Sequence, residues 1–214
     1  MNIPEKTIER LSEYRRTLIG LDRQGISHIF SHVLAGMHGI TAVQVRRDLM
    51  LIGFSSDTKK GYDVKVLIKF ISDILDSPQP MNMAIIGMGH LGQAITKYFN
   101  SKGLKLRIVA AFDIDPEKVG TTIMGIPCYS MEEFEARAES DNIDIVVLTS
   151  PSSATSGLLV PIVNAGIRGV LNFTSIPLNF PRGIVVENYD ITTLLEKVAY
   201  FVKENDENYP NESL

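Results

Sequence analysis

Cysteine and long apolar runs are what this sequence has least of. Its single cysteine, Cys128, can form neither an internal disulfide nor a multi-thiolate metal cluster. The unbroken apolar runs, such as 108–112 and 145–148, are only a few residues long, whereas crossing a bilayer takes roughly 20. The N-terminus also lacks the basic start and apolar stretch of a secretory signal. We therefore expect a cytoplasmic protein with no membrane span.

Charge is unevenly distributed along the chain. The 214 residues are 44% hydrophobic and 21% charged, as in an ordinary folded protein. Residues 1–62 hold nine Lys and Arg against six Asp and Glu, a net charge of +3, and the remaining residues carry −7. Because phosphate is attracted by local positive charge, the pattern indicates a polyanion partner for the N-terminal part.

The clearest break in the chain is Asp76-Ser77-Pro78-Gln79-Pro80. Two prolines this close together end a helix and favour extended backbone before them. Helical periodicity dominates before this segment, and short β-branched runs alternate with helical stretches after it. The second pattern is typical of a parallel sheet with crossover helices. We expect a helical unit, a linker and an α/β unit.

The helical unit is expected to contain four helices. Residues 4–21 place apolar side chains three or four apart, which favours one buried helix face. Ser31 is expected to cap a second helix that ends at Gly39, and Thr41 and Asp63 are expected to cap the third and fourth. The expected core residues of the first, third and fourth helices are Ile8, Leu11, Tyr14, Leu18, Leu21, Ala42, Val45, Leu49, Ile52, Val64, Leu67, Ile68, Ile71 and Leu75.

The exposed side of the third helix is a candidate DNA-recognition surface. At about 100° per residue, Val43 and Arg47 point away from the buried face, with Gln44 and Arg46 beside them. Arginine pairs with guanine edges or phosphates, glutamine pairs with adenine, and a helix fits the major groove. A solvated basic helix face explains the pattern equally well, but the basic charge of this unit favours DNA. Asp48 lies beside the buried face and is interpreted as a structural partner of a neighbouring arginine.

The segment between the third and fourth helices is a candidate wing. Residues 54–62 can form a short hairpin with Asp57-Thr58 at its turn, which would bring Lys59 and Lys60 to the DNA backbone. A solvated loop is an equally good interpretation. The histidines at positions 28, 32 and 38 lack companions with metal-ligand spacing, so no metal site is expected.

The second unit begins with a glycine motif in its proper context. A short strand pattern at 83–86 is followed at once by Gly87-Met88-Gly89-His90-Leu91-Gly92, which opens a helix. In a G-x-G-x-x-G motif the first glycine makes a tight turn, the second lets a pyrophosphate approach the backbone, and the third packs the helix on the strand. The helix N-terminus supplies an anion site. The motif predicts a dinucleotide-binding domain, and a glycine-rich turn without a ligand is the alternative.

A second strand, 106–112, ends at Asp113, about 20 residues past the motif. A carboxylate there accepts ribose hydroxyls and favours NAD over NADP, and no arginine follows immediately to receive a 2′-phosphate. Further strands are expected at 126–129, 143–148, 169–173 and 184–186, which together give a doubly wound parallel sheet. Ligands bind beyond the carboxyl ends of such strands. This adds Thr149, Ser150, Pro151, Asn172 and Phe173 to the glycine motif and Asp113 as expected cofactor-binding residues.

A final helix is expected from Asp190, its N-cap, to about residue 202. It carries a continuous apolar stripe, Ile191, Leu194, Leu195, Val198, Ala199 and Val202. Packing on its own sheet and packing against a second subunit both explain this stripe. The second hypothesis is the sharper one because other helices can cover both faces of the sheet. The polar, acidic end of the chain is expected to be loosely ordered.

Several short motifs occur together in the two units. The first unit contains Arg10-Leu11 with Tyr14 and Arg16, then Val45-Arg46-Arg47-Asp48-Leu49 and Lys59-Lys60-Gly61-Tyr62. The second contains the glycine motif, Phe112-Asp113-Ile114-Asp115-Pro116-Glu117-Lys118-Val119-Gly120, Gly166-Ile167, Leu171-Asn172-Phe173 and Tyr189-Asp190-Ile191. With these motifs, residues 4–202 resemble the Rex family of redox-sensing transcriptional repressors. Met88 and His90 stand where that family usually has smaller or amide residues, and the wing has less glycine and arginine than is usual.

The resemblance implies a homodimer that represses fermentative or respiratory genes and leaves its operator DNA when NADH replaces NAD. It also implies that the final helix is exchanged between subunits and that Arg16, Tyr98 and Asp190 form a redox-dependent polar network. The expected domains are a winged helix-turn-helix domain (1–76), a linker (77–82), a Rossmann-type domain (83–189), a dimerisation helix (190–203) and a flexible tail (204–214). The expected DNA contacts are Arg10, Arg16, Thr41, Gln44, Arg46, Arg47, Lys59, Lys60 and Tyr62.

Two other functions are compatible with a Rossmann-type domain. An NAD-dependent oxidoreductase needs a proton-transfer group and a substrate domain, yet the one histidine after the linker, His90, lies within the glycine motif. We therefore expect no enzyme activity. A DNA-binding regulator that responds to CoA or another nucleotide is the second alternative. Asp113 argues against it, because its carboxylate suits the ribose of NAD.

Overall fold

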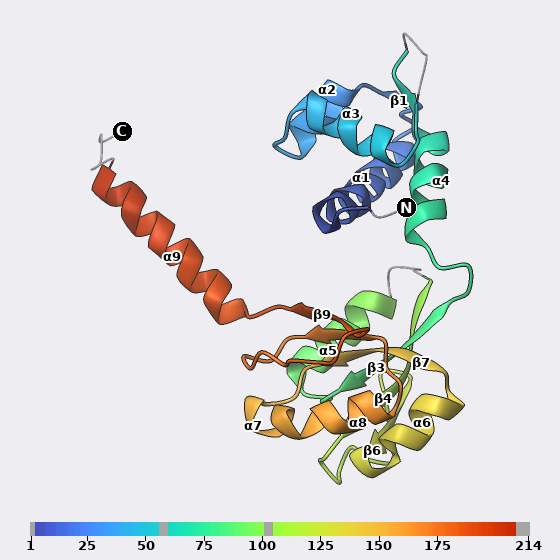
Figure 1. The fold of residues 1–214 in the computed structure, drawn as a ribbon, viewed down its shortest axis with the longest axis vertical. Helices are drawn as coiled ribbons and strands as arrows, with labels where there is room; N and C mark the ends of the chain where they lie inside the picture. Colours follow the sequence, from blue (N-terminus) through green and yellow to red (C-terminus); the bar gives the residue numbers. More distant parts are fainter. Residues whose placement is uncertain (1–2, 56–59, 101–104, 209–214) are drawn as a thin grey trace. The chain divides into compact units, whose positions relative to one another are not determined.

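Figure 1 shows the computed structural model of the chain, which describes residues 3–55, 60–100 and 105–208. The chain divides into two compact units, Met1–Pro78 and Gln79–Leu214. The division falls within the proline segment between the helical and α/β patterns. Each unit has hydrophobic clusters of its own.

The first unit is a small helical fold with a two-stranded sheet. Its elements are α1 (Glu5–Arg23), β1 (His28–Ile29), α2 (Ser31–Met37), α3 (Ala42–Leu51), β2 (Tyr62–Asp63) and α4 (Val64–Leu75). The core takes Leu11, Tyr14 and Leu18 from α1, together with side chains of α2, α3 and α4. Ile8, which was expected in this core, is exposed, and Thr7 is buried beside it.

Local capping explains where α2, α3 and α4 begin. The Thr41 hydroxyl accepts the Gln44 N–H at 3.2 Å, and Asp63 Oδ1 accepts the Val66 N–H at 3.0 Å, which confirms both predicted caps. The expected cap at Ser31 is wrong. The extended residue before α2 is Phe30, whose carbonyl oxygen accepts the N–H groups of Val33 and Leu34. Ser31 is therefore the first helical residue.

The candidate wing is only partly described. Strand β2 pairs antiparallel with β1, so its partner comes from before α2 and not from residues 54–55. This corrects the expected pairing, because the hydrogen bonds of Tyr62–Asp63 go to the distant strand. The expected turn at Asp57-Thr58 and the side chain of Lys59 lie outside the described residues.

The second unit is a doubly wound sheet of seven strands in the order β5-β6-β4-β3-β7-β8-β9. All neighbouring strands are parallel except β5 and β6, which are antiparallel. The strands are β3 (Met81–Ile86), β4 (Leu106–Asp113), β5 (Thr122–Ile123), β6 (Ile126–Ser130), β7 (Ile143–Leu148), β8 (Gly169–Asn172) and β9 (Val185–Asn188). The helices are α5 (His90–Asn100), α6 (Phe134–Ser140), α7 (Ser152–Thr155), α8 (Leu159–Asn164) and α9 (Ile191–Asn208).

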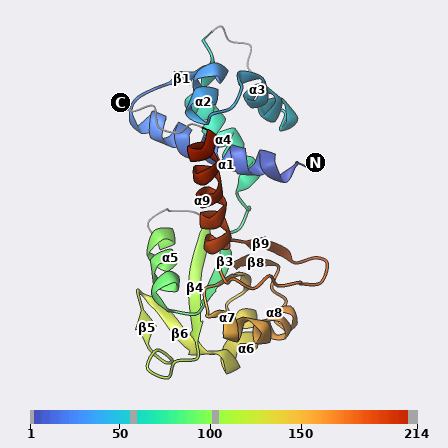
Figure 2. The same ribbon diagram turned by 90° about the vertical axis from the view of Figure 1, so that its left-hand side faces the viewer.

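The central strand β3 is buried on both faces. Figure 2 shows α5 on one side of the sheet and α6 and α8 on the other. Side chains alternate along a strand. Ala84 and Ile86 accordingly join the cluster under α6 and α8, while Met83 and Ile85 join the cluster under α5. This two-sided burial explains why the strand patterns of the second unit are continuous apolar runs.

Two expected boundaries are wrong. Strand β3 begins at Met81, inside the expected linker, because Met81 and Asn82 pair with residues of β4. Helix α9 continues to Asn208, inside the expected loose tail. Propagating a formed helix costs less than starting one, so good helix formers such as Lys203 and Glu204 extend it. The short strand β5 was not anticipated.

Candidate functional site

A cavity of about 460 Å³ lies where β3, β4, β7 and β8 end. The carboxyl ends of the strands are the usual ligand position in a doubly wound sheet. The structure brings eight of the twelve predicted cofactor residues to its wall: Gly87, Gly89, Leu91, Asp113, Thr149, Ser150, Pro151 and Phe173. The sequence therefore located this cavity through the strand ends and the glycine motif.

The three glycines of the motif occupy three different environments. Gly87 has a φ of +100°, and a Cβ there would lie 2.7 Å from the Ser150 nitrogen. A Cβ on Gly92 would meet the Gly87 carbonyl oxygen and would lie 2.9 Å from Thr149 Oγ1. A Cβ on Gly89 would have nothing within 4 Å. Gly87 thus makes the turn, Gly92 packs α5 on the sheet, and Gly89 leaves open space at the cavity wall for a ligand.

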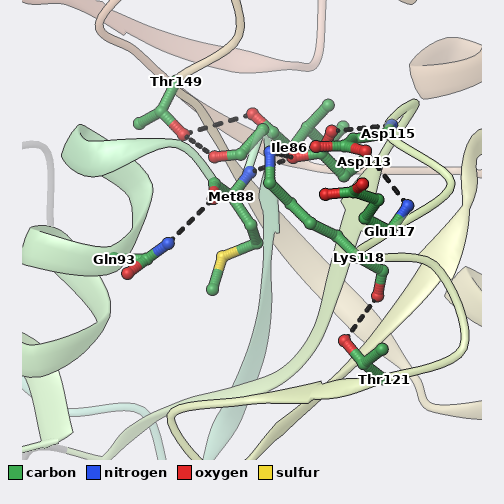
Figure 3. Close-up of polar contacts among 10 residues, drawn as sticks. Ile86, Met88, Gln93, Asp113, Asp115, Glu117, Lys118, Thr121 and Thr149 are labelled. Atoms are coloured by element: carbon green, nitrogen blue, oxygen red, sulfur yellow. Dashed lines mark hydrogen bonds and ion pairs between the residues drawn. The ribbon is translucent and has the colours of Figure 1, made fainter.

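Asp113 is held from three sides at the end of β4. Its Oδ2 accepts the Met88 N–H at 2.7 Å and an N–H of the Lys118 ammonium at 3.1 Å, and its Oδ1 accepts the Asp115 N–H at 3.0 Å (Figure 3). Burial raises the pKa of this carboxyl, but these donors outweigh burial and hold the pKa below its ordinary value. Asp113 is therefore a carboxylate at neutral pH.

Lys118 is a cavity residue that the sequence reasoning missed. Its Nζ lies 3.1 Å from Asp113 Oδ2 and 3.3 Å from Asp115 Oδ2, and it lines the cavity. One helical turn places it there, since the Asp115 carbonyl oxygen accepts the N–H of Lys118 at 3.0 Å. The sequence does show two acids followed by a base, Asp113, Asp115 and Lys118. This spacing predicts an ion pair only when the turn between them is known.

Ser150 supplies a polar atom that fits a ligand. Its Oγ is buried and has no hydrogen-bond partner within the described chain. Its neighbour Thr149 differs, because that hydroxyl donates to the Gly87 carbonyl oxygen at 2.6 Å. Leaving a buried hydroxyl unpaired costs about 1–3 kcal/mol. A ligand with an acceptor at this place would recover that free energy.

Three predicted cofactor residues, Met88, His90 and Asn172, are not among the residues that line the cavity. The Met88 side chain is fully buried in the cluster under α5, so only its backbone N–H serves the site. His90 is exposed at the start of α5, away from the cavity lining. The buried Asn172 amide bonds Ile176, Asn188 and Thr174 within the protein. The strand–turn–helix geometry directs the side chains of Met88 and Asn172 into the protein. Contact of these three residues with a cofactor stays a prediction.

Helix α3 presents Arg46 and Arg47 on its exposed side. Arg46 donates to Ser31 Oγ at 3.1 Å, which ties it to the start of α2. Gln44 is half-buried and donates its amide to Asp48 Oδ1 at 2.9 Å, so this amide already has one partner inside the unit. Thr41 remains at the helix N-terminus as its cap.

The other predicted DNA contacts lie in varied surroundings. Arg16 and Lys60 are exposed, and Tyr62 is half-buried with its ring 5.9 Å from that of Phe54. Arg10 is different, since its guanidinium forms a two-contact ion pair with the buried Asp48. This confirms Asp48 as a structural partner of an arginine. The ion pair also joins α1 to α3. A contact of Arg10 with DNA stays a prediction.

The proposed switch residues come from different elements of the chain. Tyr98 of α5 lines a second hollow together with Phe173 and Tyr189. Asp190 begins α9, where it accepts the Thr192 N–H at 3.0 Å and the Thr193 hydroxyl at 2.7 Å, as an N-cap does. Arg16 belongs to the first unit. Their polar network stays a prediction.

The apolar stripe of α9 is exposed along its length. Leu194, Leu195 and Val198 are 52%, 63% and 60% exposed. This stripe therefore does not pack on its own sheet. No helix in the described parts of the chain, α9 included, is long and apolar enough to cross a membrane. The same residues contain no group of three or more His, Cys, Asp or Glu that could hold a metal ion.

A helical unit with a capped, basic third helix, joined to a doubly wound domain with a dinucleotide-type cavity, defines a class: DNA-binding regulators that carry a ligand domain. The comparisons with known proteins agree. The family model described as "CoA binding domain" matches residues 78–176, and the one described as "Putative DNA-binding protein N-terminus" matches residues 2–49.

Full-length relatives identify the family. The redox-sensing transcriptional repressor Rex of Leuconostoc citreum is 36% identical over 94% of this chain and 93% of its own. That of Geobacillus kaustophilus is 36% identical over 99% of this chain and 97% of its own. The crystal structure of RSP with β-NAD⁺ and operator DNA matches all of both chains with a TM-score of 0.88 at 30% identity. A second RSP structure, with β-NADH, covers 98% of this chain and 99% of its own with a TM-score of 0.86, also at 30% identity. The chain belongs to the Rex family of redox-sensing transcriptional repressors.

Proposed function

We propose that this protein is a redox-sensing transcriptional repressor, which binds operator DNA as a homodimer and leaves the DNA when NADH replaces NAD⁺. The observation that carries this proposal is the cavity of the second unit. Gly89 leaves space at its wall, the buried Ser150 hydroxyl lacks a partner in the described chain, and Asp113 is an anchored carboxylate. These three features suit the phosphate and ribose parts of a dinucleotide.

In this proposal four parts of the cavity wall have distinct roles in binding the cofactor. The N-terminus of α5, approached over Gly89, binds the pyrophosphate through backbone N–H groups. Asp113 accepts a ribose hydroxyl, and Ser150 supplies a hydroxyl to the ligand. The bound nicotinamide supplies the redox signal, because its ring is cationic only when oxidised. The Thr149 hydroxyl donates a hydrogen bond to the Gly87 carbonyl oxygen and so joins the end of β7 to the glycine turn.

DNA binding is assigned to the first unit, with α3 in the major groove. Arg46 and Arg47 are its principal contacts because both are exposed on one helix. The proposed surface also includes Arg10, Arg16, Thr41, Gln44 and the wing residues Lys59, Lys60 and Tyr62. We further propose that residues 1–76 act as the DNA-binding domain, that 79–189 act as the NAD(H) domain, and that α9 is exchanged between the two subunits.

We also propose that the protein binds NAD(H) without oxidising or reducing a substrate, and that it acts in the cytoplasm. Among the described residues of the cavity wall, the titratable side chains are Asp113 and Lys118, and these two are paired with each other. Neither is a good proton donor or acceptor at neutral pH, because each charged form is stabilised by the other.

The test is a DNA-shift assay on the segment upstream of the protein's own gene. Purified protein is titrated with NADH, NAD⁺ and CoA, and oxidation of NADH by a panel of small carbonyl compounds as hydride acceptors is followed by absorbance in parallel. The proposal expects release from DNA by NADH at concentrations where NAD⁺ and CoA leave the complex intact. Release by CoA with no effect of NADH would establish the CoA-responsive alternative, and turnover of NADH would establish an oxidoreductase.

A further inference from the structure

Lys118 combines two properties at one edge of the cavity. Its ammonium faces two carboxylates, Asp113 and Asp115 (Figure 3). Its side chain also lines the cavity. The NAD-type assignment of such a site rests on an acid at the end of the second strand, which repels a 2′-phosphate. Here the acid does not act alone. A cation lies within ion-pair distance of it.

Counting donors and acceptors shows what remains for a ligand. A carboxylate has about four acceptor sites, and three of those on Asp113 are used by Met88, Asp115 and Lys118. One site is left, on Oδ1. A lysine ammonium has three donors, and two of those on Lys118 face Asp113 and Asp115. One donor is left, on the ammonium that already binds Oδ2 of the same carboxylate.

A donor beside an acceptor is complementary to a vicinal diol, in which one hydroxyl donates and the other accepts. Asp113 and Lys118 therefore match the 2′- and 3′-hydroxyls of a ribose better than either side chain would alone. The Lys118 charge also reduces the negative potential of Asp113 and Asp115 at the same place. Charges a few ångströms apart near a protein surface interact more strongly than they do in bulk water, so the Lys118 charge affects the selectivity between NADH and NADPH.

We propose that Lys118 is a specificity-determining residue of the cofactor site: it donates to the adenosine ribose, and it offsets part of the repulsion that Asp113 and Asp115 exert on a 2′-phosphate. The proposal rests on the proposed NAD(H) binding. It implies that the protein discriminates against NADPH less strongly than its two acids alone would. The preference for NADH is then set by the balance of two acids and one base.

The experiment uses the full-length protein and measures dissociation constants for NADH and NADPH by nicotinamide fluorescence, without DNA. Lys118→Met removes the ammonium while keeping an unbranched side chain. We expect NADH binding to weaken about tenfold, as for the loss of one charge-assisted hydrogen bond, and NADPH binding to weaken about tenfold more. Lys118→Arg keeps the charge and is expected to preserve the ratio of the two constants.

A second variant separates charge from loop structure. Asp115→Asn removes one negative charge from the same cluster, so the ratio should shift in the opposite direction, towards NADPH. A variant that merely loosened the 113–118 turn would weaken both cofactors by the same factor. Lys97→Met, on the exposed side of α5 and outside the cavity, is the matched control and should change neither constant.

A ratio that stays constant in Lys118→Met, or that shifts the same way in Lys118→Met and Asp115→Asn, overturns the proposal. Opposite shifts establish it. This readout is separate from the DNA response. If NADH binds but does not release DNA, the redox-repressor function fails while the role of Lys118 is still decided by the ratio; if neither cofactor binds the parent protein, both fail.

Discussion

Asp48 of α3 and Arg10 of α1 are joined by two contacts of 2.7 Å, although they lie 38 residues apart in the sequence. The Tyr14 hydroxyl adds a third bond to the same carboxylate at 2.9 Å, and the Gln44 amide a fourth at 2.9 Å. Burial and the neighbouring Asp48 raise the pKa of Tyr14, so this hydroxyl stays a donor. One carboxylate therefore fixes the rotation of α3 on α1, and with it the direction in which Arg46 and Arg47 point.

Removing this carboxylate should destabilise the first unit. Asp48→Ala leaves a guanidinium, a phenol and an amide without their shared acceptor, and breaking a buried ion pair costs about 3–5 kcal/mol. Since Arg10 is 22% exposed, we expect the lower end of that range. Hydrogen exchange of the α1 and α3 amides and urea unfolding measure the loss. The control is Asp73→Ala, whose exposed pair with Lys69 should contribute less than about 1 kcal/mol.

The same cluster should make the first unit sensitive to acid. Burial raises the pKa of Asp48, but hydrogen bonds from Arg10, Tyr14 and Gln44 outweigh it, and the net pKa lies below the ordinary 3.8. A lowered pKa stabilises the fold fully above the ordinary value, and this contribution is lost as pH falls through the depressed one. Urea unfolding of the parent protein and of Asp48→Asn at several pH values is the measurement. The difference in stability should be constant at neutral pH and should shrink below about pH 3.8.

The sequence predicts those features of the site that depend on neighbouring residues, and it misses those that depend on distant ones. The glycine motif and the strand ends are local backbone features, and they located the cavity correctly. The side-chain directions of Met88 and Asn172 depend on the assembled sheet, so the sequence could not predict that both are buried. The particular arginine that pairs with Asp48 could not be named from the sequence, because Arg10 lies 38 residues away from it. Lys118 was overlooked because only the turn after β4 brings it back to Asp113.

Two glycines of the motif should respond differently to alanine. Gly89→Ala meets open space, so the fold should keep its stability to within about 1 kcal/mol while NADH binding falls at least tenfold, because the methyl group occupies the approach of the pyrophosphate. Gly92→Ala forces a methyl group against the Gly87 carbonyl oxygen and should destabilise the second unit by about 1–3 kcal/mol. Thermal unfolding and NADH titration distinguish them. Equal loss of stability in both variants would contradict the roles assigned to these glycines.

The two exposed arginines of α3 should contribute to DNA binding alone. Arg46→Ala and Arg47→Ala are each expected to weaken operator binding by about 1–3 kcal/mol, as for the loss of a base or phosphate contact. NADH affinity should not change, because the cofactor cavity is lined entirely by residues of the second unit. Lys69→Ala, which removes an exposed charge from α4, is the control for a general loss of positive charge. Unchanged DNA affinity in both arginine variants would remove the recognition-helix assignment.

The exposed apolar stripe of α9 should be the surface through which two copies of the chain form a dimer. An 18-residue helix with its apolar face in water needs a cover, and a second copy of the chain supplies one with two-fold symmetry. Leu195→Glu combined with Val198→Glu should therefore give monomers or aggregates, whereas Lys197→Glu, outside the stripe on the same helix, should leave the dimer intact. Truncation before Asp190 should act like the double variant. Light scattering measures the oligomeric state.

DNA binding should fall together with dimer formation, because a two-fold dimer places two recognition helices on the half-sites of an inverted repeat. NADH can then release the DNA only if it binds the DNA-free arrangement of the two subunits more tightly than the DNA-bound one. A monomeric double variant should accordingly bind NADH as before but no longer shift operator DNA in the assay. Its affinity for DNA should also no longer depend on NADH. A soluble monomer that still binds the operator and still responds to NADH would show that the stripe of α9 is needed neither for DNA binding nor for its control by NADH.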